Sequence, residues 1–428
     1  MQSARRQLAV FLAVYAVALA LLLPHLSLWL DEVLTLLGAV QPDLNALLDY
    51  LKTVPGGTPL AFLVPHWSIA VFGNSAFTAR LPSALASIAA CPAVYFLAQR
   101  MRLRRPILAV LVFALWPMQF RYALEARPYA LALALTVWTT ELFLSLLEHP
   151  SSKLRIGLYA LLTVAATLTQ PYAIFIPVAH LVWAGMTNRA AVRIPAFAIL
   201  LAALAILPWY LYFRGSWSMV TAEQNLGPGN WWTILVFFHE FAGSGYAGTA
   251  LLLGGLALGL RRVTELRLFW LLSAVIPLVL VPLGNSVFHY FFAIRQLIYN
   301  LPVCALLYVR GAESAGRLGN IVLAAFLAVS LYEDISWFRK PREDWQAAAA
   351  ALQNADCVTF VDDSKKIYSY FVPAVKTCTE EATQVVLAIS PYGDAQAAPN
   401  AEKVLAARGF TKQSEQSFNG PRVVVYRR

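Results

Sequence analysis

The chain has 428 residues, of which 59% are hydrophobic and only 13% are charged. Soluble globular proteins carry about 25% charged residues, so this composition excludes a water-soluble globular protein. The net charge of +10 comes from basic residues that lie mostly in short connections between apolar segments, a pattern typical of membrane-protein loops rather than of nucleic-acid-binding surfaces. We therefore predict a protein embedded in membrane lipids, with no nucleic-acid partner.

Apolar segments long enough to cross a bilayer core of about 30 Å recur from Leu8 to Tyr332. The first follows Arg5 and Arg6, as a signal peptide would, but the residues Pro24 to Trp29 are too bulky for a cleavage site. We expect it to remain as the first span. The apolar pattern predicts about eleven spans, at roughly residues 8–24, 78–98, 106–120, 128–147, 156–170, 172–186, 194–213, 244–260, 268–284, 296–309 and 320–334.

Basic residues cluster in alternate connections between these spans, which places the clusters on one side of the membrane. The positive-inside rule identifies this side as the cytoplasm, so the C-terminal part lies outside. The stretch Gly56 to Gly73 is apolar but is interrupted by Pro59, Pro65 and His66. We interpret it as an interfacial helix in the first outer loop, because counting it as a span would reverse the topology. We expect a multi-pass protein of the bacterial inner (plasma) membrane.

The polar end of the chain predicts a second domain. We assign residues 1–334 to an all-α polytopic membrane domain and residues 335–428 to a small extracytoplasmic α/β domain. A helical stretch from Asp344 to Leu352 is followed by alternating strand and helix signals, at Cys357–Val361, Lys366–Phe371, Gln384–Ile389, Glu402–Arg408 and Arg422–Tyr426.

The four cysteines fall into two kinds. Cys91 and Cys304 lie in apolar runs, where a free Cys behaves as a small hydrophobic residue. Cys357 and Cys378 flank predicted strands in the domain that we place in an oxidising compartment, so we predict a disulfide between them; two unpaired thiols are the alternative.

Two adjacent carboxylates, Asp31 and Glu32, stand in the first outer loop at the end of an apolar stretch. Ionisable groups near apolar surroundings are costly and tend to be functional. One of these acids could act as a general base that takes the proton of an acceptor hydroxyl. The alternative is that both acids only cap the helix that follows them, as acids commonly do at helix N-termini.

A second outer loop contains Glu125, Arg127, Pro128 and Tyr129, with Pro128 at the expected first turn of the next span. An arginine beside an outward-facing helix N-terminus makes a plausible phosphate site, because its fork of donors acts together with the helix dipole. The alternative is an anchor at the membrane edge in which Arg127 pairs with Glu125.

Basic residues are few in the other outer connections, where they include Lys52, Arg80 and Arg295. Arg80, Arg127 and Arg295 come from separate segments, and together they could surround an anionic lipid headgroup. His239 and Glu240 raise the question of a divalent metal shared with His66 or His289. The spacing of these residues is not that of a metal motif, so we predict no certain cofactor, with His239 as the one candidate metal ligand.

These motifs, taken in order, resemble the GT-C glycosyltransferases of the protein O-mannosyltransferase and lipid A aminoarabinose transferase type (family-39-like). The resemblance covers nearly the whole chain. The matching segments are Trp29 to Glu32 with Thr35, Phe72-Gly73 through Arg80 to Ser83, Glu125 to Ala130, Arg295 to Pro302, and Glu343 to Ala348.

The resemblance implies an inverting transfer of a sugar from a polyprenyl-phosphate donor to a protein, lipid or glycan acceptor on the extracytoplasmic face. It implies Asp31 as the catalytic base, with Glu32 beside it, and arginines that hold the carrier phosphate. The full set of expected substrate-binding residues is Arg80, Arg127, Tyr129, Arg295, Lys52 and Glu125.

The sequence departs from the family pattern at two places. Gly56 to Pro59 stand where relatives often carry a His-Pro-Pro or acidic-Lys-Pro element, and the acidic partner expected for His239 is missing.

Two other classes of function remain as alternatives to the enzyme. A flippase or transporter of a lipid-linked sugar would place ionisable residues mid-span, where Glu141 is the clearest example. A scaffolding protein built around the C-terminal domain would leave the Asp31 to Arg295 set without a purpose.

Overall fold

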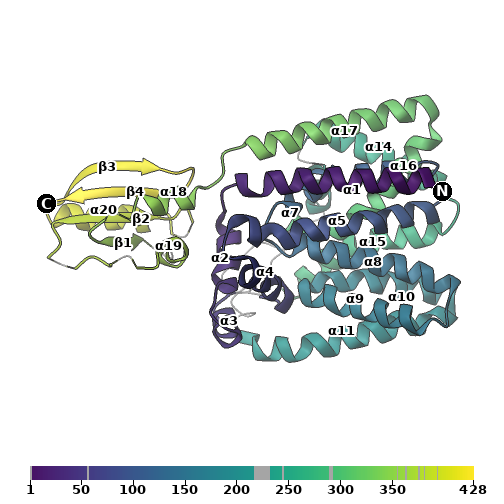
Figure 1. Cartoon of the computed structure of the whole chain (residues 1–428), viewed down its shortest axis with the longest axis horizontal. Helices are drawn as coiled ribbons and strands as arrows, with labels where there is room; N and C mark the ends of the chain where they lie inside the picture. Colours follow the sequence, from purple (N-terminus) through teal and green to yellow (C-terminus); the bar gives the residue numbers. More distant parts are fainter. Residues whose placement is uncertain are drawn as a thin grey trace.

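The computed structural model consists of a long helical bundle with a small α/β domain at one end (Figure 1). The N-terminus lies at the opposite end of the bundle. The structure describes residues 2–54, 57–215, 232–242, 245–288, 293–353, 355–361, 364–374, 376–379, 381–392 and 394–428.

Every predicted apolar segment forms a helix or a bent pair of helices. The helices are α1 (Gln2–Leu22), α5 (Ala76–Arg100), α6 (Pro106–Ala114) with α7 (Pro117–Ala123), α8 (Tyr129–Glu148), α9 (Lys153–Thr169), α10 (Phe175–Thr187), α11 (Arg193–Tyr212), α14 (Tyr246–Arg262), α15 (Arg267–Phe288), α16 (Leu301–Ser314) and α17 (Gly316–Arg339). Short 3-10 turns join several of them, namely η1 (Leu23–His25), η2 (Pro171–Ile174), η3 (Arg189–Val192) and η4 (Ile294–Asn300). A further helix, α13 (Trp232–Phe241), precedes α14.

The bundle is that of a multi-pass membrane protein. Among the described residues, six helices are long and apolar enough to cross a membrane, and α6 with α7 makes a seventh if this pair, bent by 64°, is one span. The bend falls at Pro117, which cannot continue the hydrogen-bond ladder of the preceding helix. The helices α9, α14 and α16 have 17, 17 and 14 residues, so eleven crossings stay a prediction.

Two of the shorter helices pack unusually close together. A Cβ added at Gly259 of α14 would lie 1.9 Å from the carbonyl oxygen of Leu307 in α16, and one at Gly311 would lie 2.5 Å from the oxygen of Gly255. Glycine is therefore required where these backbones touch, as in other membrane bundles whose helices associate through small residues.

Three short helices lie across the end of the bundle that faces the C-terminal domain (Figure 1): α2 (Leu30–Ala39), α3 (Leu44–Leu51) and α4 (Pro59–Phe72). The predicted interfacial stretch becomes α4, with Pro59 in its first turn. Its 14 residues reach only about 21 Å at 1.5 Å per residue, less than the thickness of a bilayer core. This length agrees with the interfacial interpretation.

The C-terminal domain contains a mixed sheet in the order β1-β2-β4-β3, with β1 (Val358–Val361) parallel to β2 (Gln384–Ile389). The strands β3 (Thr411–Ser417) and β4 (Arg422–Arg427) complete it in antiparallel pairs. The predicted helical and strand signals correspond to α18 (Trp345–Ala350), β1, α19 (Ser364–Phe371), β2, α20 (Ala397–Ala407) and β4. The sequence analysis missed β3, whose residues are polar and exposed. The expected boundary at residue 334 falls inside α17, which continues to Arg339.

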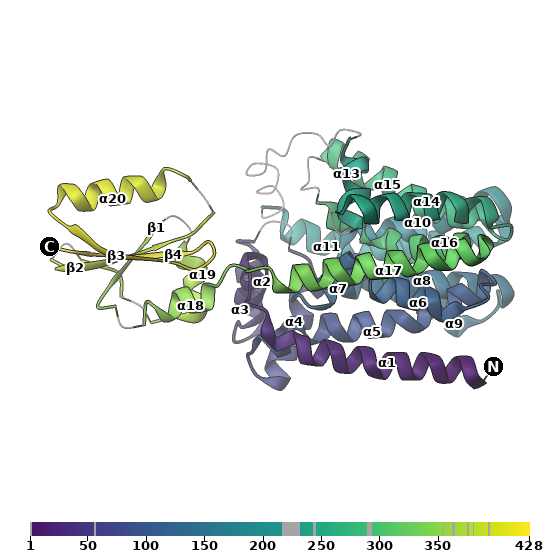
Figure 2. The same ribbon diagram turned by 90° about the horizontal axis from the view of Figure 1, so that it is seen from above.

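The two faces of this sheet have different neighbours, because side chains alternate along a strand. Val385, Leu387 and Ile389 of β2 pack in one cluster with α20, whereas Val386 and Ala388 pack in a second cluster with α18 and α19. Figure 2 shows α20 and the α18–α19 pair on opposite sides of the sheet. The second cluster also contains Leu28 and side chains of α2, so one hydrophobic core joins the sheet to the membrane domain.

The cysteines confirm the predicted pairing. Cys357 and Cys378 form a disulfide with a Cα–Cα distance of 4.8 Å, whereas Cys91 and Cys304 are buried and unpaired.

Candidate active site

A buried ion pair fixes the first turn of α2. Glu32 and Arg80 are both completely inaccessible to solvent, and Arg80 Nε and Nη2 donate to the two carboxylate oxygens of Glu32 at 2.8 and 2.7 Å. A two-pronged contact of this kind is among the strongest that a carboxylate makes in a protein. Neither residue is exposed at the α2–α4 end of the bundle.

The remaining donors of Arg80 bind the backbone that leads from α1 to α2. Arg80 Nη1 donates to the carbonyl oxygens of Leu23 and Leu26 at 3.0 and 2.7 Å, and Nη2 donates to that of Ser27 at 3.0 Å. A guanidinium has five N–H groups, and all five are used. In this conformation Arg80, which we expected to contact substrate, has no N–H left for a phosphate.

Glu32 also holds the loop between α7 and α8. The backbone N–H of Ala126 donates to Glu32 Oε1 at 2.7 Å, and the hydroxyl of Ser83 donates to the carbonyl oxygen of Arg127 at 3.1 Å. The pair of Glu32 and Arg80 therefore binds α2, α5, the connection after α1 and the loop before α8 into one unit. This unit decides where the neighbouring side chains of Asp31 and Arg127 lie.

Two arginines from different parts of the chain converge on Asp31. Arg127 Nη2 lies 3.4 Å and Arg295 Nη2 lies 3.3 Å from Asp31 Oδ2. The three side chains are between 19% and 23% exposed, so they are enclosed by protein but reachable from outside. The structure brings together the acid and two of the three arginines that the sequence analysis placed in one site.

Neighbouring polar groups hold these arginines. Arg127 Nη1 donates to Thr35 Oγ1 and to the carbonyl oxygen of Asp31, both at 2.9 Å, and Thr35 donates to the same carbonyl oxygen. Arg295 Nε donates to the hydroxyl of Tyr129 at 2.9 Å, and both guanidinium groups lie within 5.8 Å of the Tyr129 ring centre. Tyr129 is therefore part of the site.

Glu125, an expected substrate contact, is bound to a residue that the sequence analysis missed. Arg342, just beyond the last helix of the bundle, donates from Nη2 to Glu125 Oε1 at 2.6 Å. Burial raises the pKa of Glu125 and outweighs the opposing charge of Arg342. The other oxygen, Oε2, is buried and has no hydrogen-bond partner among the residues that the structure describes.

Lys52, another expected substrate contact, has partners of its own. Its ammonium pairs with Asp49 at 2.8 Å and lies over the ring of Tyr212 at 5.0 Å. Its side chain is 47% exposed. The structure therefore gives Lys52 no contact with the Asp31 set.

The metal candidates are separate in the structure. Within the described ranges, no group of three or more His, Cys, Asp or Glu side chains could hold a metal ion. His66 Nδ1 bonds to the carbonyl oxygen of Ala39 at 2.8 Å, and His239 Nδ1 lies 3.3 Å from the hydroxyl of Thr249. His289 lies outside the described residues.

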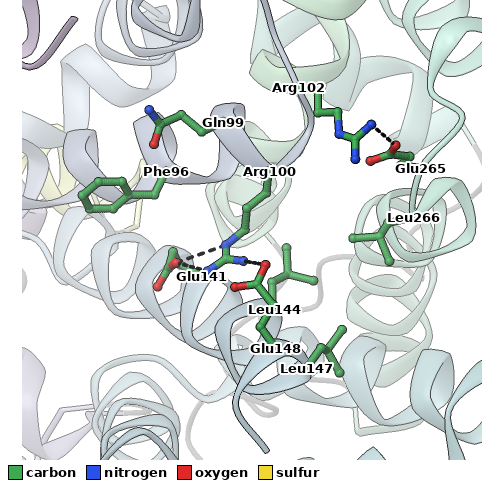
Figure 3. Close-up of a pocket in the computed structure, with 10 residues that line it drawn as sticks. All are labelled: Phe96, Gln99, Arg100, Arg102, Glu141, Leu144, Leu147, Glu148, Glu265 and Leu266. Carbon is green, nitrogen blue, oxygen red and sulfur yellow. Dashed lines mark hydrogen bonds and ion pairs between the residues drawn. The ribbon is translucent and has the colours of Figure 1, made fainter. Parts of the chain in front are cut away.

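A second group of charges surrounds a cavity of about 580 Å³ at the other end of α5 (Figure 3). Arg100 binds Glu141 at 2.8 Å and Glu148 at 2.8 Å, and Arg102 pairs with Glu265 at 2.6 Å. Arg80 and Arg100 are 20 residues apart on one helix, or about 30 Å. Glu141, the acid that motivated the transporter alternative, is thus paired with a cation near a helix end and does not stand alone in mid-span.

Comparison with known proteins places this geometry in a recognised fold. Residues 55–212, from just before α4 to the end of α11, match the family model described as dolichyl-phosphate-mannose-protein mannosyltransferase. No curated protein matches the sequence.

Solved structures match the chain over nearly its full length. ArnT from Cupriavidus metallidurans in the apo state is similar with a TM-score of 0.67 and 12% identity, over 99% of this chain and 98% of that chain. The same protein bound to undecaprenyl phosphate gives a TM-score of 0.63 and 12% identity, over 97% of both chains. The Archaeoglobus fulgidus oligosaccharyltransferase gives a TM-score of 0.53 and 14% identity, over 85% of this chain and 57% of that chain. The two ArnT structures therefore show the fold of this chain, which is the fold that the resemblance to GT-C glycosyltransferases implied.

Proposed function

We propose that this protein transfers a sugar from a polyprenyl-phosphate donor to an acceptor on the extracytoplasmic face, with inversion at the anomeric carbon. Asp31 is the general base, and Arg127 and Arg295 hold the donor phosphate. The observation that carries the proposal is the convergence of two arginines, from two separate segments, on one partly exposed carboxylate. This arrangement provides a base and two phosphate ligands within one small site.

The donor class is supported by the relatives. The matching family model is described by an activity that uses dolichyl-phosphate-mannose, and one of the similar structures contains undecaprenyl phosphate. Both are polyprenyl phosphates, and both arginines of this chain suit a phosphate that carries a lipid.

The reaction follows from the groups that are present. Asp31 accepts the proton of the acceptor hydroxyl while the acceptor oxygen forms a bond to the anomeric carbon. The bond between that carbon and the phosphate oxygen breaks, and its electron pair stays on the phosphate. The growing negative charge is stabilised by Arg127 and Arg295, so these residues contribute more in the transition state than in donor binding.

The distances between Asp31 and the two arginines fit this scheme. Charge-assisted N–H···O bonds are usually about 2.7–2.9 Å long, whereas both arginines lie 3.3–3.4 Å from Asp31 Oδ2. A donor phosphate would compete for these loosely paired arginines and leave Asp31 free to take a proton.

Glu32 and Arg80 have a positioning role in this proposal. Both are buried and bound to each other, so we assign the role of general base to Asp31 alone. Asp31 and Glu32 are adjacent in the sequence, but the helix turn directs one towards the site and the other into the protein.

The orientation of the protein follows from its charges. Clusters of basic residues lie in alternate connections, and by the positive-inside rule these connections face the cytoplasm. The α2–α4 end and the C-terminal domain then lie on the other side of the bacterial inner (plasma) membrane. The acceptor, a protein, lipid or glycan, would then reach Asp31 from the outer side.

The test is transfer by purified protein in lipid nanodiscs supplied with a panel of undecaprenyl-phosphate-linked sugars and with a cell-envelope extract as the source of acceptor. The readout is release of undecaprenyl phosphate that depends on the extract. Asp31→Asn should lower turnover by roughly 10²-fold or more, because the amide cannot accept the proton. Arg127→Ala and Arg295→Ala should lower kcat and raise KM for the donor, and Arg127→Lys should recover only part of the loss because it lacks the guanidinium fork.

Arg317→Ala is the matched control, because Arg317 is exposed on α17 and outside the site. Near-normal turnover by well-folded Asp31→Asn would refute the assignment of the base. Unchanged kcat/KM in both alanine variants would refute the phosphate contacts.

A further inference from the structure

Glu343 lies where the chain passes from α17 into the C-terminal domain, and the proposed reaction gives it no role. Its carboxylate is a junction of three segments. Glu343 Oε2 accepts the backbone N–H of Leu30 at 3.1 Å and the indole N–H of Trp345 at 2.7 Å. Glu343 Oε1 accepts the hydroxyl of Tyr392, which stands in the loop after β2.

The contact with Leu30 is made at a place where a helix needs an acceptor. Leu30 is the first residue of α2, and the first N–H groups of a helix have no carbonyl partner within it. A carboxylate there satisfies one such group and is stabilised by the positive end of the helix dipole. Asp31 is the next residue, and Glu32 follows it, so the first turn of α2 is held from two sides.

The backbone around Glu343 is itself fixed to the C-terminal domain. The N–H of Asp344 donates to the carbonyl oxygen of Phe418 at 3.0 Å, and Trp345 is completely buried. A Cβ added at Gly420 would lie 3.2 Å from Pro391 and 3.5 Å from the Glu343 side chain. Glu343 therefore cannot move without disturbing the loops that follow β2 and β3.

Hydrophobic packing reinforces the same connection. The cluster that contains Trp345 and Val386 of the C-terminal domain also contains Val33 and Leu36 of α2, which are completely buried. The helix α2, which carries Asp31, thus shares its hydrophobic core with the sheet. Glu343 makes the polar contact at the start of α2.

Tyr392 extends the junction to the surface of the C-terminal domain. The residue is 45% exposed, although its hydroxyl is bound to Glu343. Burial raises the pKa of Tyr392, the hydrogen bond and charge of Glu343 raise it further, and the charge of Asp31 adds to this. Tyr392 thus connects Glu343 to the loop that follows β2 in the C-terminal domain.

We propose that Glu343 is a positioning residue for Asp31, and that Tyr392 orients Glu343 from the C-terminal domain. The C-terminal domain then acts as a component of the active site. This inference rests on the proposed function for the role of Asp31, but the contact with α2 can be tested without it.

The experiment compares Glu343→Gln, Tyr392→Phe and the control Glu402→Gln in the full-length protein. Glu402 lies on α20, on the far face of the sheet. Hydrogen–deuterium exchange of peptides that cover residues 28–36 should be faster in Glu343→Gln by roughly tenfold at the start of α2, because the Leu30 N–H loses a charged acceptor. Tyr392→Phe should show a smaller increase, and Glu402→Gln should show none.

Turnover is measured on the same preparations. Glu343→Gln should lower kcat by roughly tenfold while KM for the donor changes by less than about twofold, since the donor phosphate is held by other residues. Tyr392→Phe should lower kcat by about threefold. Because it keeps the aromatic ring, this variant tests the proposal even if Glu343→Gln folds poorly.

The outcomes separate the possible failures. Unchanged exchange in α2 would overturn the anchoring by Glu343, whatever the activity. Faster exchange with unchanged kcat would leave Glu343 a purely structural residue and overturn the positioning role. Absence of transfer by the wild-type protein from every donor would instead refute the proposed function, and the exchange result would still decide the contact.

Discussion

The pair of Glu32 and Arg80 gives the sharpest prediction about stability. Arg80 supplies five hydrogen bonds, two to Glu32 and three to backbone carbonyl oxygens, in a site with no solvent access. Lysine has three N–H donors, so Arg80→Lys loses at least two of these five hydrogen bonds. A hydrogen bond to a charged group contributes about 1.5–3 kcal/mol, which gives a loss of about 3–6 kcal/mol.

Glu32→Gln perturbs the same unit from the other side. The amide keeps the size of the side chain but leaves the buried guanidinium without its counter-charge, and breaking a buried pair in this way costs about 3–5 kcal/mol. The total stability of a folded domain is only about 5–15 kcal/mol. Both variants should therefore be seriously destabilised, although neither changes Asp31.

The assay is thermal unfolding in nanodiscs, followed by tryptophan fluorescence, together with turnover at a temperature where the variants remain folded. Arg80→Lys and Glu32→Gln should unfold several degrees below the wild type, whereas the exposed control Arg317→Lys should not. Turnover should fall as well, because Glu32 no longer fixes the loop that carries Arg127. A wild-type unfolding midpoint in Arg80→Lys would show that this unit does not hold the site together, and our reasoning about it would be wrong.

Two further predictions concern the outer side of the molecule. The disulfide closes a segment whose ends are 21 residues apart. Replacing Cys357 and Cys378 by Ser should therefore lower the free energy of unfolding of the C-terminal domain by about 3 kcal/mol. Equal protease resistance of that domain in variant and wild type would contradict this. The pKa of Glu125 is raised by burial in the folded protein above the unfolded value of about 4.3. The stability that it contributes is therefore complete below about pH 4.3 and is lost as the pH rises through the folded pKa. Glu125→Gln should reduce this loss of stability, and superimposable stability–pH curves for the two proteins would exclude it.

The fold was largely predictable because its elements are encoded in local patterns. Long apolar segments bounded by basic residues gave the helices of the bundle, and the short Pro-containing stretch after Gly56 gave α4. The strand β3 was missed because Thr411 to Ser417 are all exposed, so no alternation of apolar and polar residues reveals it. An edge strand held mainly by backbone bonds to β4 leaves little trace in the sequence.

The site was predictable only in part. Asp31, Arg127 and Arg295 were expected together because their residue types and their side of the membrane suit one reaction. The contacts of Glu125 and Leu30 were not predicted, because they join residues far apart in the chain. Arg342 binds Glu125 across 217 positions, and Glu343 binds Leu30 across 313. The burial of Arg80 was equally hidden, since an arginine at the start of a span looks the same whether it faces a ligand or a carboxylate.

The contact between Leu30 and Glu343 has a consequence for biosynthesis. The chain emerges from the ribosome N-terminus first, so α2 leaves it among the earliest segments, while the acceptor for its first N–H arrives 313 residues later. The hydrophobic partners of α2 in the sheet arrive later still. A nascent or truncated chain that lacks the C-terminal domain would therefore carry every residue that we assign to the chemistry, but the start of α2 would have lost these partners, and we expect its turnover to be lower.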